Sequence, residues 1–448
     1  MAQQRDPATL AVVSVATLVA LADYTAPAVV LPTLAADLHA SLTAQIWLLN
    51  GITVGLAVLL LTAGSLADDY GRRRVFVGGV IGLALSIAAS GLATSAWIFV
   101  AARVVQGASS AAIVAAGLGL VAAAFPPGPA RTRAAATWGS MIGLGIASGP
   151  LLAIAANHVG GWRTFYWFAA LVAFGVGVAA RMVLTESRAA RPRPVDAAGV
   201  VLLGAALTAL LIGVTNGRSG WLREATVLPV ALALVLFALF AGREVRTAEP
   251  MIDLRLFTRP AFLLSTLGAL FTGVAVIGPM TFVATALQRG SGWTATQTAV
   301  LASTWAFTMF LVGLAARRLR PSTHGGWELG IGFIVAGLGA LLTLVFVGQA
   351  WGWLLPGMVV AGLGGGLINA TLPRLAVGTV PPERAAMGSG ANNTARYLGS
   401  AVGVAVAASV APTSARETLL VGVVLCVVAV LALAPLAARS RVLVPVAA

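Results

Sequence analysis

The sequence contains no lysine, and all 28 of its basic residues are arginine. A chain without a lysine amine has neither a Walker-type phosphate loop nor a Schiff-base nucleophile, so both kinds of site are excluded. Its single cysteine, Cys426, excludes disulfide frameworks and cysteine-ligated zinc. The three histidines fall in different predicted loops, and no paired-acid or serine-triad arrangement accompanies them. We therefore expect no metal and no cofactor, and the sequence does not indicate an enzyme.

Charged residues are also scarce, at 9% of the 448 residues, whereas soluble domains carry about 25%. Hydrophobic residues make up 59% of the chain and aromatic residues only 7%, because the apolar mass is Ala, Val, Leu and Gly. This composition favours closely packed membrane helices. The net charge of +14 does not indicate a nucleic-acid partner, because the arginines are spread through many short loops rather than gathered on one face. The sequence predicts an all-α integral membrane protein.

Fourteen apolar runs approach or exceed the roughly 20 residues that a membrane helix needs. The runs are 10–31, 45–66, 75–94, 97–122, 134–156, 164–184, 197–215, 225–242, 261–286, 295–316, 327–348, 351–373, 386–410 and 418–438. If the N-terminus is cytoplasmic and each run crosses once, 21 arginines lie on the cytoplasmic side, five on the outer side and two within spans. By the positive-inside rule, this bias predicts a multi-pass protein of the cytoplasmic membrane with both termini cytoplasmic.

An internal sequence repeat divides the chain further. FPPGPARTRAAA follows the fourth run and VPPERAAMG follows the twelfth, while arginine clusters follow both the second and the tenth. The offset of eight runs predicts an N-terminal six-helix bundle (1–184), a linker with two extra helices (185–260) and a C-terminal six-helix bundle (261–448). Such repeats are typical of secondary transporters, whose substrate site lies between the halves. Chance recurrence of arginine-rich loops and Pro-Pro turns is the alternative.

The segment GSLADDYGRRRVF (64–76) lies between the second and third runs. It resembles the signature loop of the major facilitator superfamily, Gly-x-Leu-Ala-Asp-x-x-Gly-Arg-(Arg/Lys). The matching residues are Gly64, Leu66, Ala67, Asp68, Gly71, Arg72 and Arg73. The resemblance implies the major facilitator fold and a loop that latches the two halves in one conformation, with gating roles for Asp68 and Arg72. The alternative to a latch is a simple turn with a helix cap, kept on the cytoplasmic side by its arginines.

Two opposite charges lie at similar depth within predicted spans. Arg103 is six residues past Trp97, about 9 Å from the outer end of its run, and Asp23 is eight residues before Leu31, about 12 Å from the same end. Each costs roughly 2.5–3.5 kcal/mol in hydrocarbon, so such residues face a partner or the bundle interior. Gln106 falls one turn from Arg103 on the same face.

The segment RVVQG (103–107) and the Asp23-x-Thr25…Leu31-Pro32 pattern resemble two signatures of the drug:proton antiporters in that superfamily. The resemblance implies proton coupling for Asp23 and Arg103. The polar residue that often precedes the Ala-Leu-Pro end is replaced by Ala28. A purely structural ion pair is the alternative.

The fifth run contains GLGIASGPLLA (143–153), which resembles the antiporter signature through Gly145, Gly149 and Pro150. The resemblance implies exchange rather than uptake, although the later Gly-Gly pair of the family is replaced by Ala153 and Ile154. A packing face of small residues is the alternative.

Two further segments resemble the fourteen-span branch of these antiporters: AEPMIDLRLF (248–257) and ANNTARYLGSAVGVAV (391–406). Arg396 in the second lies about 14 Å into its run, where it could contact an anion, a carbonyl or a helix end, or be passive. The candidates for a substrate cavity are Tyr24, Asn50, Gln106, Trp138, Trp305, Phe307, Asn369, Asn393 and Arg396.

Together these features predict proton-driven efflux of amphipathic, often cationic drugs or antibiotics by alternating access. The expected partners are a small-molecule substrate, protons and the lipid bilayer, and we expect a monomer. A transporter of the same superfamily that exports or imports one specific metabolite is the alternative.

Overall fold

The computed structural model describes residues 6–126, 129–188, 196–217, 220–247, 254–316, 325–379, 385–411 and 413–440. Helices account for almost all of these residues. The chain forms two compact units, Met1–Ala197 and Ala198–Ala448.

Thirteen helical segments of the described residues are long and apolar enough to cross a membrane. They match thirteen of the fourteen predicted runs, and the exception is α15 (Ala385–Val410). This helix has 26 residues, about 39 Å at 1.5 Å per residue, so it is long enough to cross. Its Asn392, Asn393 and Arg396 lower its mean hydropathy. Length and composition together therefore identify thirteen candidate spans.

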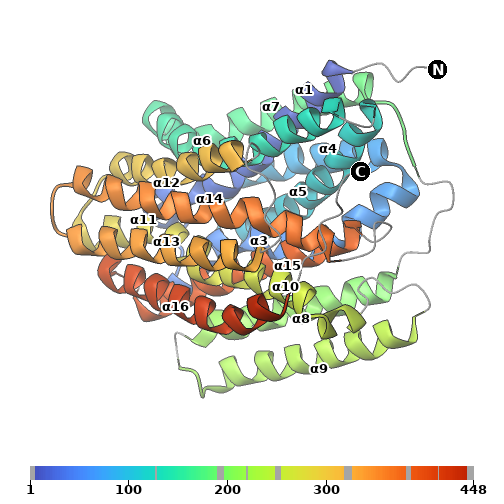
Figure 1. Ribbon diagram of the computed structural model, residues 1–448. Coiled ribbons are helices and arrows are strands. Elements are labelled where there is room, and N and C mark those ends of the chain that lie inside the picture. Colours follow the sequence, from blue (N-terminus) through green and yellow to red (C-terminus); the bar gives the residue numbers. More distant parts are fainter. Residues whose placement is uncertain are drawn as a thin grey trace. The chain divides into compact units, whose positions relative to one another are not determined.

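The described residues of the first unit form seven helices, shown in blue to green in Figure 1. They are α1 (Pro7–Thr25), α2 (Pro27–Asp37), α3 (Leu42–Tyr70), α4 (Arg72–Gly91), α5 (Ala96–Ala124), α6 (Pro129–Gly160) and α7 (Trp162–Val183). Side-chain caps fix several starts: Asp6 accepts from the N–H groups of Ala8 and Thr9, and Ser95 accepts from that of Ile98.

The predicted single run 10–31 is wrong in one respect, since the helix is interrupted at Ala26. Pro27 begins α2 and has no N–H to donate to the carbonyl of Asp23, four residues earlier. The interruption therefore frees a backbone acceptor inside the unit, next to a buried carboxylate.

Close glycine contacts hold the first unit together. A Cβ added to Gly107 of α5 would stand 2.0 Å from the carbonyl oxygen of Ile52, and one added to Gly55 of α3 would stand 2.1 Å from that of Val104. No side chain fits such gaps, so α3 and α5 touch backbone to backbone. In the same unit α4 packs on α5 and α7, and α1 packs on α6.

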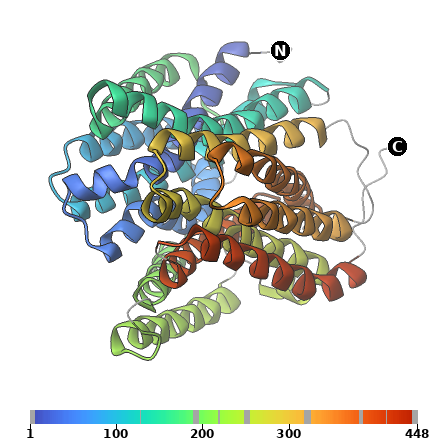
Figure 2. The same cartoon turned by 90° about the vertical axis from the view of Figure 1, so that its left-hand side faces the viewer.

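The second unit begins with a helical hairpin of α8 (Ala197–Asn216) and α9 (Glu224–Arg246), which lie side by side in Figures 1 and 2. The amide of Asn216 donates to the carbonyl of Ala225 at 2.9 Å and closes the turn. The remaining elements are η2 (Leu254–Thr258), α10 (Pro260–Phe271), η3 (Thr272–Ile277), α11 (Gly278–Ser291), α12 (Ala295–Ala316), α13 (Gly325–Phe346), η4 (Trp351–Leu354), α14 (Leu355–Gly378), α15 and α16 (Ala415–Arg439).

The predicted run 261–286 also differs from the structure, because a π-helical segment, η3, separates α10 from α11. This wide turn packs on α15 and α16. Cys426 of α16 is buried, and its thiol lies 3.9 Å from the carbonyl oxygen of Ala275 in η3. Figure 1 shows α13 running alongside α14 and α16 in orange and red.

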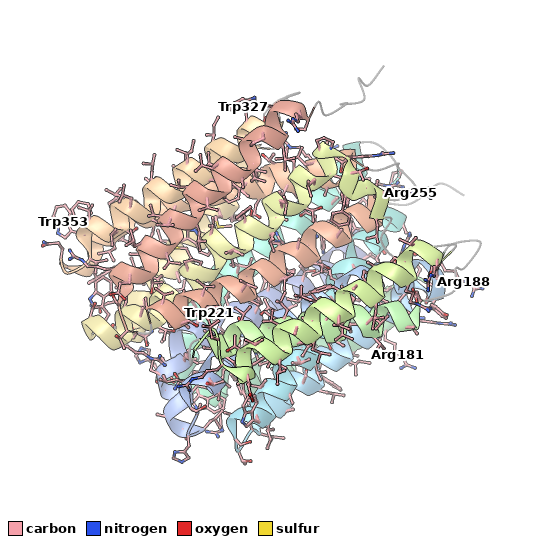
Figure 3. The ribbon with its side chains drawn as sticks, turned by 90° about the horizontal axis from the view of Figure 1, so that it is seen from below. Arg181, Arg188, Trp221, Arg255, Trp327 and Trp353 are labelled. Carbon is pink, nitrogen blue, oxygen red and sulfur yellow. The ribbon has the colours of Figure 1, made fainter. Side chains whose placement is uncertain are left out.

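Labelled side chains mark the two ends of the helices of the second unit. Figure 3 places Trp221 and Trp353 near one end of these helices and Arg255 near the other. Trp221 follows α8, in a segment predicted to lie outside, and Trp353 precedes α14, near the start of the predicted run 351–373. Arg255 was predicted to lie inside.

Candidate functional site

Asp23 of α1 and Arg103 of α5 form a fully buried ion pair. Nη1 of Arg103 lies 3.1 Å from Oδ2 of Asp23, and both side chains have no exposed surface. The same nitrogen donates to the carbonyl oxygen of Asp23 at 2.9 Å, and Nη2 donates to that of Tyr24 at 3.1 Å. The guanidinium thus binds both the carboxylate and the helix end that Pro27 leaves open. The structure brings together the two charges that the sequence placed at similar depth.

Gln106 extends this pair to a third helix. Its Oε1 accepts from Nη1 of Arg103 at 2.9 Å, while its Nε2 donates to the carbonyl of Ser86 at 3.1 Å and to the hydroxyl of Ser90 at 2.8 Å. Gln106 is fully buried. Its amide orients Arg103 against α4, so Gln106 is part of the charge network.

Three buried polar atoms around the pair have no hydrogen-bond partner among the described residues: Oδ1 of Asp23, Nε of Arg103 and the hydroxyl of Tyr166. Tyr166 lies on α7 and interacts electrostatically with both Arg103 and Asp23. Unsatisfied groups of this kind are rare in folded proteins and mark functional sites or internal water. The pair therefore keeps a free carboxylate oxygen on which a proton can bind.

Aromatic rings fill the space around Tyr166. Its ring meets those of Phe99, Trp162 and Phe165 edge to face, at centroid distances of 5.3, 5.8 and 5.3 Å. Sequence reasoning missed Tyr166, Ser86 and Ser90. A hydroxyl in an apolar helix was the one available signal, and it is a weak one.

The expected antiporter motif lies against the helix that carries Asp23. A Cβ added to Gly149 would stand 2.4 Å from the carbonyl oxygen of Ala22, and one added to Gly145 would stand 2.6 Å from that of Leu18. The hydroxyl of Thr25 donates across the same contact to the carbonyl of Ile146 at 3.1 Å. Pro150 follows inside α6. The motif therefore sets the distance between α6 and the end of α1.

The loop motif surrounds a sharp turn at Gly71, whose φ is +116°. Such a backbone favours glycine, and a Cβ there would also stand 2.7 Å from the carboxylate of Glu186. That carboxylate accepts from the N–H groups of Arg73 and Arg74 at 3.0 and 3.3 Å, and so caps the start of α4. Sequence reasoning missed Glu186.

Other members of the motif are placed as follows. A Cβ at Gly64 would meet no heavy atom within 4 Å, whereas one at Gly119 of α5 would stand 2.6 Å from Nε of Arg72. Arg73 donates to the carbonyl of Arg181 at 2.6 Å, near the end of α7. The side chain of Asp68 lies outside the described part of the structure. Within the first unit, the loop is therefore tied to α5 and α7.

The remaining cavity candidates of the first unit are mostly enclosed. Trp138 is buried and donates from Nε1 to the hydroxyl of Thr17 at 2.9 Å, which links α6 to α1. Asn50 is buried on α3, and Tyr24 is half-buried at the end of α1. Trp138 is thus engaged in helix packing.

In the second unit, Trp305 lines an apolar pocket with Met280 and Met358, and its buried Nε1 has no hydrogen-bond partner among the described residues. Phe307 is exposed, with its ring 5.7 Å from that of Phe310. The pocket has an accessible volume of about 10 Å³, the size of a single water molecule, so in this conformation it does not hold a cargo.

Arg396, Asn369 and Asn393 form a second polar cluster. Nη1 of Arg396 donates to Oδ1 of Asn369 at 3.3 Å, and Nη2 donates to Oδ1 of Asn393 at 2.7 Å. All three side chains are half-buried. Across the described ranges, His, Cys, Asp and Glu side chains do not gather in threes that could hold a metal ion.

Comparison of the sequence with known proteins shows which family it resembles. The sequence profile of the Major Facilitator Superfamily matches residues 13–404. The "Probable actinorhodin transporter" of Streptomyces coelicolor is 34% identical over 416 residues, which are 89% of this chain and 71% of that protein. The "Tetracenomycin C resistance and export protein" of Streptomyces glaucescens is 32% identical over 411 residues, covering 89% and 74%. The "Multidrug efflux pump LfrA" of Mycolicibacterium smegmatis is 29% identical over 401 residues, covering 88% and 79%.

Solved structures share the fold. The human organic anion transporter MFSD10 (TETRAN) superposes with a TM-score of 0.68 at 19% identity, covering 96% of this chain and all of that one. The peptide transporter POT in complex with sulfate superposes with a TM-score of 0.69 at 14% identity, covering 96% and 95%. At these identities the likeness shows the fold alone.

Proposed function

The chain belongs to the Major Facilitator Superfamily, and from this premise we propose that it is a proton-driven exporter of amphipathic drugs or antibiotics. Its many apolar helices and transporter relatives indicate a multi-pass membrane protein and a transporter rather than an enzyme. In the proposal it sits in the cytoplasmic membrane as a monomer with fourteen crossings and both termini inside. Residues 1–184 and 261–448 are the two moving bundles, and 185–260 carry the extra pair of helices.

Two kinds of observation support export. Three relatives that match 88–89% of the chain are named for transport, for resistance and export, or for multidrug efflux. The buried pair of Asp23 and Arg103 carries the proton-coupling part of the proposal, because its carboxylate has a free oxygen inside the apolar unit. An ionisable residue at such a position marks a proton or substrate pathway.

In the proposed cycle, Asp23 takes a proton from the outside. The protonated carboxyl no longer attracts Arg103 as an anion does, so the pair loosens and the bundle shifts toward its inward-open state. Arg103 keeps its bonds to Gln106 and to the carbonyls of Asp23 and Tyr24, which retain the guanidinium in place. Release of the proton to the cytoplasm restores the pair.

The driving force is sufficient for export. One proton crossing ~100 mV supplies about 2.3 kcal/mol. One pH unit adds about 1.4 kcal/mol. Together they sustain a gradient of roughly several hundred-fold for a neutral cargo at one-to-one exchange.

The signature loop supplies the gating step of the proposal. Arg72 and Arg73 are tied to α5 and α7, and Glu186 caps the helix that they begin. With Asp68 as the further member of the latch, these contacts hold the cytoplasmic end of the first unit in one arrangement. Their release accompanies opening to the inside.

A vesicle experiment tests the proposal. Purified protein is reconstituted in liposomes with an acid lumen and offered ethidium, an anionic dye, a neutral antibiotic and a sugar. An antiporter accumulates its cargo in the acid lumen in either orientation, because departing protons drive the exchange. Protein-free liposomes and an uncoupler are the controls. Accumulation only from an acid outside would identify a symporter and refute the proposal.

The second candidate is a transporter of one specific metabolite, and the fixed polar cluster at Arg396 favours it. A specific cavity binds through fixed polar partners, whereas a polyspecific one is lined by aromatic and methionine side chains such as Trp305 and Met280. Competition between unrelated cargoes in the same vesicles separates the two. Mutual inhibition supports a broad exporter, and its absence supports the specific transporter.

A further inference from the structure

Arg396 lies near the middle of a long helix. It is the twelfth of the 26 residues of α15, so about 16 Å of helix precede it and about 21 Å follow it. Its side chain is half-buried, so one side of it remains accessible. A charge at this depth in a membrane costs free energy, so such residues are retained where they interact with an ion or a substrate.

Within the described part of the second unit, no carboxylate neutralises Arg396. The acidic residues described there all lie in the first or last turn of a helix: Glu224, Glu244, Glu328 and Glu417. Glu328 is paired with Arg374 at 2.6 Å. Arg103 of the first unit has Asp23 as its counter-ion. The second unit thus holds a cation with neutral partners where the first unit holds an ion pair.

The partners of Arg396 orient its guanidinium without cancelling its charge. The oxygens of Asn369 and Asn393 take one hydrogen from each terminal nitrogen. The Nε–H has no hydrogen-bond partner among the described residues. The ring of Tyr397 lies 5.1 Å from the guanidinium carbon. The guanidinium of Arg396 is held by neutral groups and still has N–H groups without partners. It is therefore already oriented to bind a carboxylate.

The backbone beneath Arg396 is firmly placed. A Cβ added to Gly273 of η3 would stand 2.1 Å from the carbonyl oxygen of Arg396, and one added to Gly399 would stand 2.1 Å from that of Leu270. The end of α10 and the π-helical segment therefore touch α15 backbone to backbone at Arg396 and one turn after it. A binding residue whose backbone is fixed by such a contact loses little conformational freedom when its ligand binds.

We propose that Arg396, with Asn369 and Asn393, binds a carboxylate of the cargo. The inference rests on the proposed export function and narrows its cargo to amphipathic organic anions. It departs from the cationic cargo that the sequence led us to expect. The bound anion supplies the counter-ion that the described residues do not.

Equilibrium binding to the purified protein tests this inference without requiring proton coupling. The probes are 1-pyrenebutyrate, its neutral primary amide and 1-pyrenebutylamine, which share one ring system and differ in charge. Energy transfer from tryptophan to pyrene reports binding. We expect the wild-type protein to bind the carboxylate about tenfold more tightly than the amide, the effect of one charge-assisted hydrogen bond.

Substitutions assign the preference to the cluster. Arg396→Gln should abolish the preference for the carboxylate, whereas Arg396→Lys should retain part of it. Asn369→Asp and Asn393→Asp add a carboxylate of nearly unchanged shape, and each should abolish or reverse the preference. Arg374→Gln removes an arginine that is paired at a helix end, and it should leave the preference intact. Thermal unfolding of each variant shows that the protein remains folded.

Two results would overturn the inference: tighter binding of the amine than of the carboxylate, or a carboxylate preference that survives in folded Arg396→Gln. Neither result bears on export, which the acid-lumen vesicles measure separately. If the preference is present but no acid-driven accumulation occurs, the anion site stands and the proton-driven export function falls.

Discussion

Gly149 of α6 lies so close to Ala22 of α1 that a single added methyl carbon would stand 2.4 Å from the carbonyl oxygen of Ala22. Ala22 precedes Asp23, and Arg103 binds the next two carbonyls of the chain. The glycine of the antiporter motif and the buried ion pair therefore meet on one turn of α1. A shift of α6 at this point moves the carboxylate.

Gly149→Ala should push α6 from α1, because the new methyl would stand 2.2 Å from the hydroxyl of Thr25 and 2.4 Å from the carbonyl oxygen of Ala22, and the backbone oxygen cannot rotate away. We expect a destabilisation of about 1–3 kcal/mol, as for other overpacked sites. Thermal unfolding in detergent measures it, together with proton-driven accumulation in vesicles. Gly139→Ala on the same helix is the matched control, since a methyl there meets no heavy atom within 4 Å. Equal effects of the two substitutions would contradict the close contact.

Asp23→Asn should reduce proton-driven accumulation at least tenfold, because an amide cannot take up the proton. It should also lower the unfolding temperature, since a buried charge that loses its partner costs about 3–5 kcal/mol. Accumulation is measured in vesicles across a range of lumenal pH. Glu417→Gln makes the same chemical change at the start of α16 and should be neutral. Transport against a gradient with unchanged pH dependence would remove Asp23 from the coupling step.

Glu186→Ala should loosen the start of α4, since its carboxylate accepts from two N–H groups of the first turn. The expected loss of stability is about 1 kcal/mol, the value of a helix cap. Turnover should fall while cargo affinity is unchanged, because the contact lies in the gating loop. Glu224→Ala, at the first residue of α9, is the control.

Asp68→Asn should likewise slow turnover and leave binding largely intact. Single-turnover exchange and equilibrium binding, measured on the same preparation, separate the two quantities. Wild-type rates in this variant would show that Asp68 has no part in the latch.

The end of α2 and the start of α7 are joined through Asp37, which binds Arg163 and accepts from Nε1 of Trp162 at 3.2 Å. The hydrogen bond from Arg163 holds the pKa of Asp37 below its usual value. A carboxyl with a lowered pKa in the folded state stabilises the protein above its unfolded pKa, near 4, and loses this effect as the pH falls through the folded value.

Asp37→Asn should therefore lower the unfolding temperature at pH 7, and the difference from wild type should vanish toward pH 3. The pair is partly exposed, so the effect should stay below about 1 kcal/mol. Arg163→Gln should show the same pH pattern, and the double variant should add little to either. A difference that is constant across this pH range would mean that the charge of Asp37 contributes nothing.

Hydropathy located the spans well because the bilayer fixes their length. The predicted run 97–122 lies within α5, and the run 225–242 lies within α9. Interruptions inside helices escaped this reasoning. The missing bond at Pro27 and the π-helical segment η3 leave the apolar composition of their runs unchanged.

The charges of the site could be predicted because ionised residues are rare in apolar runs. Asp23 and Arg103 are conspicuous in the sequence for this reason, and so is Arg396. Their neutral partners were not predictable. Ser90 lies 16 residues from Gln106, and Glu186 lies 113 residues from Arg73, so only the folded chain brings them together.

Cys426 gives the molecule an experimental convenience. Its thiol is enclosed between α16 and η3, and the sequence offers no second sulfhydryl and no lysine amine. A maleimide will therefore react at engineered positions in preference to this shielded native thiol. Paired spin labels or fluorophores can thus report the separation of chosen helices during a transport cycle while every native side chain of the core is kept.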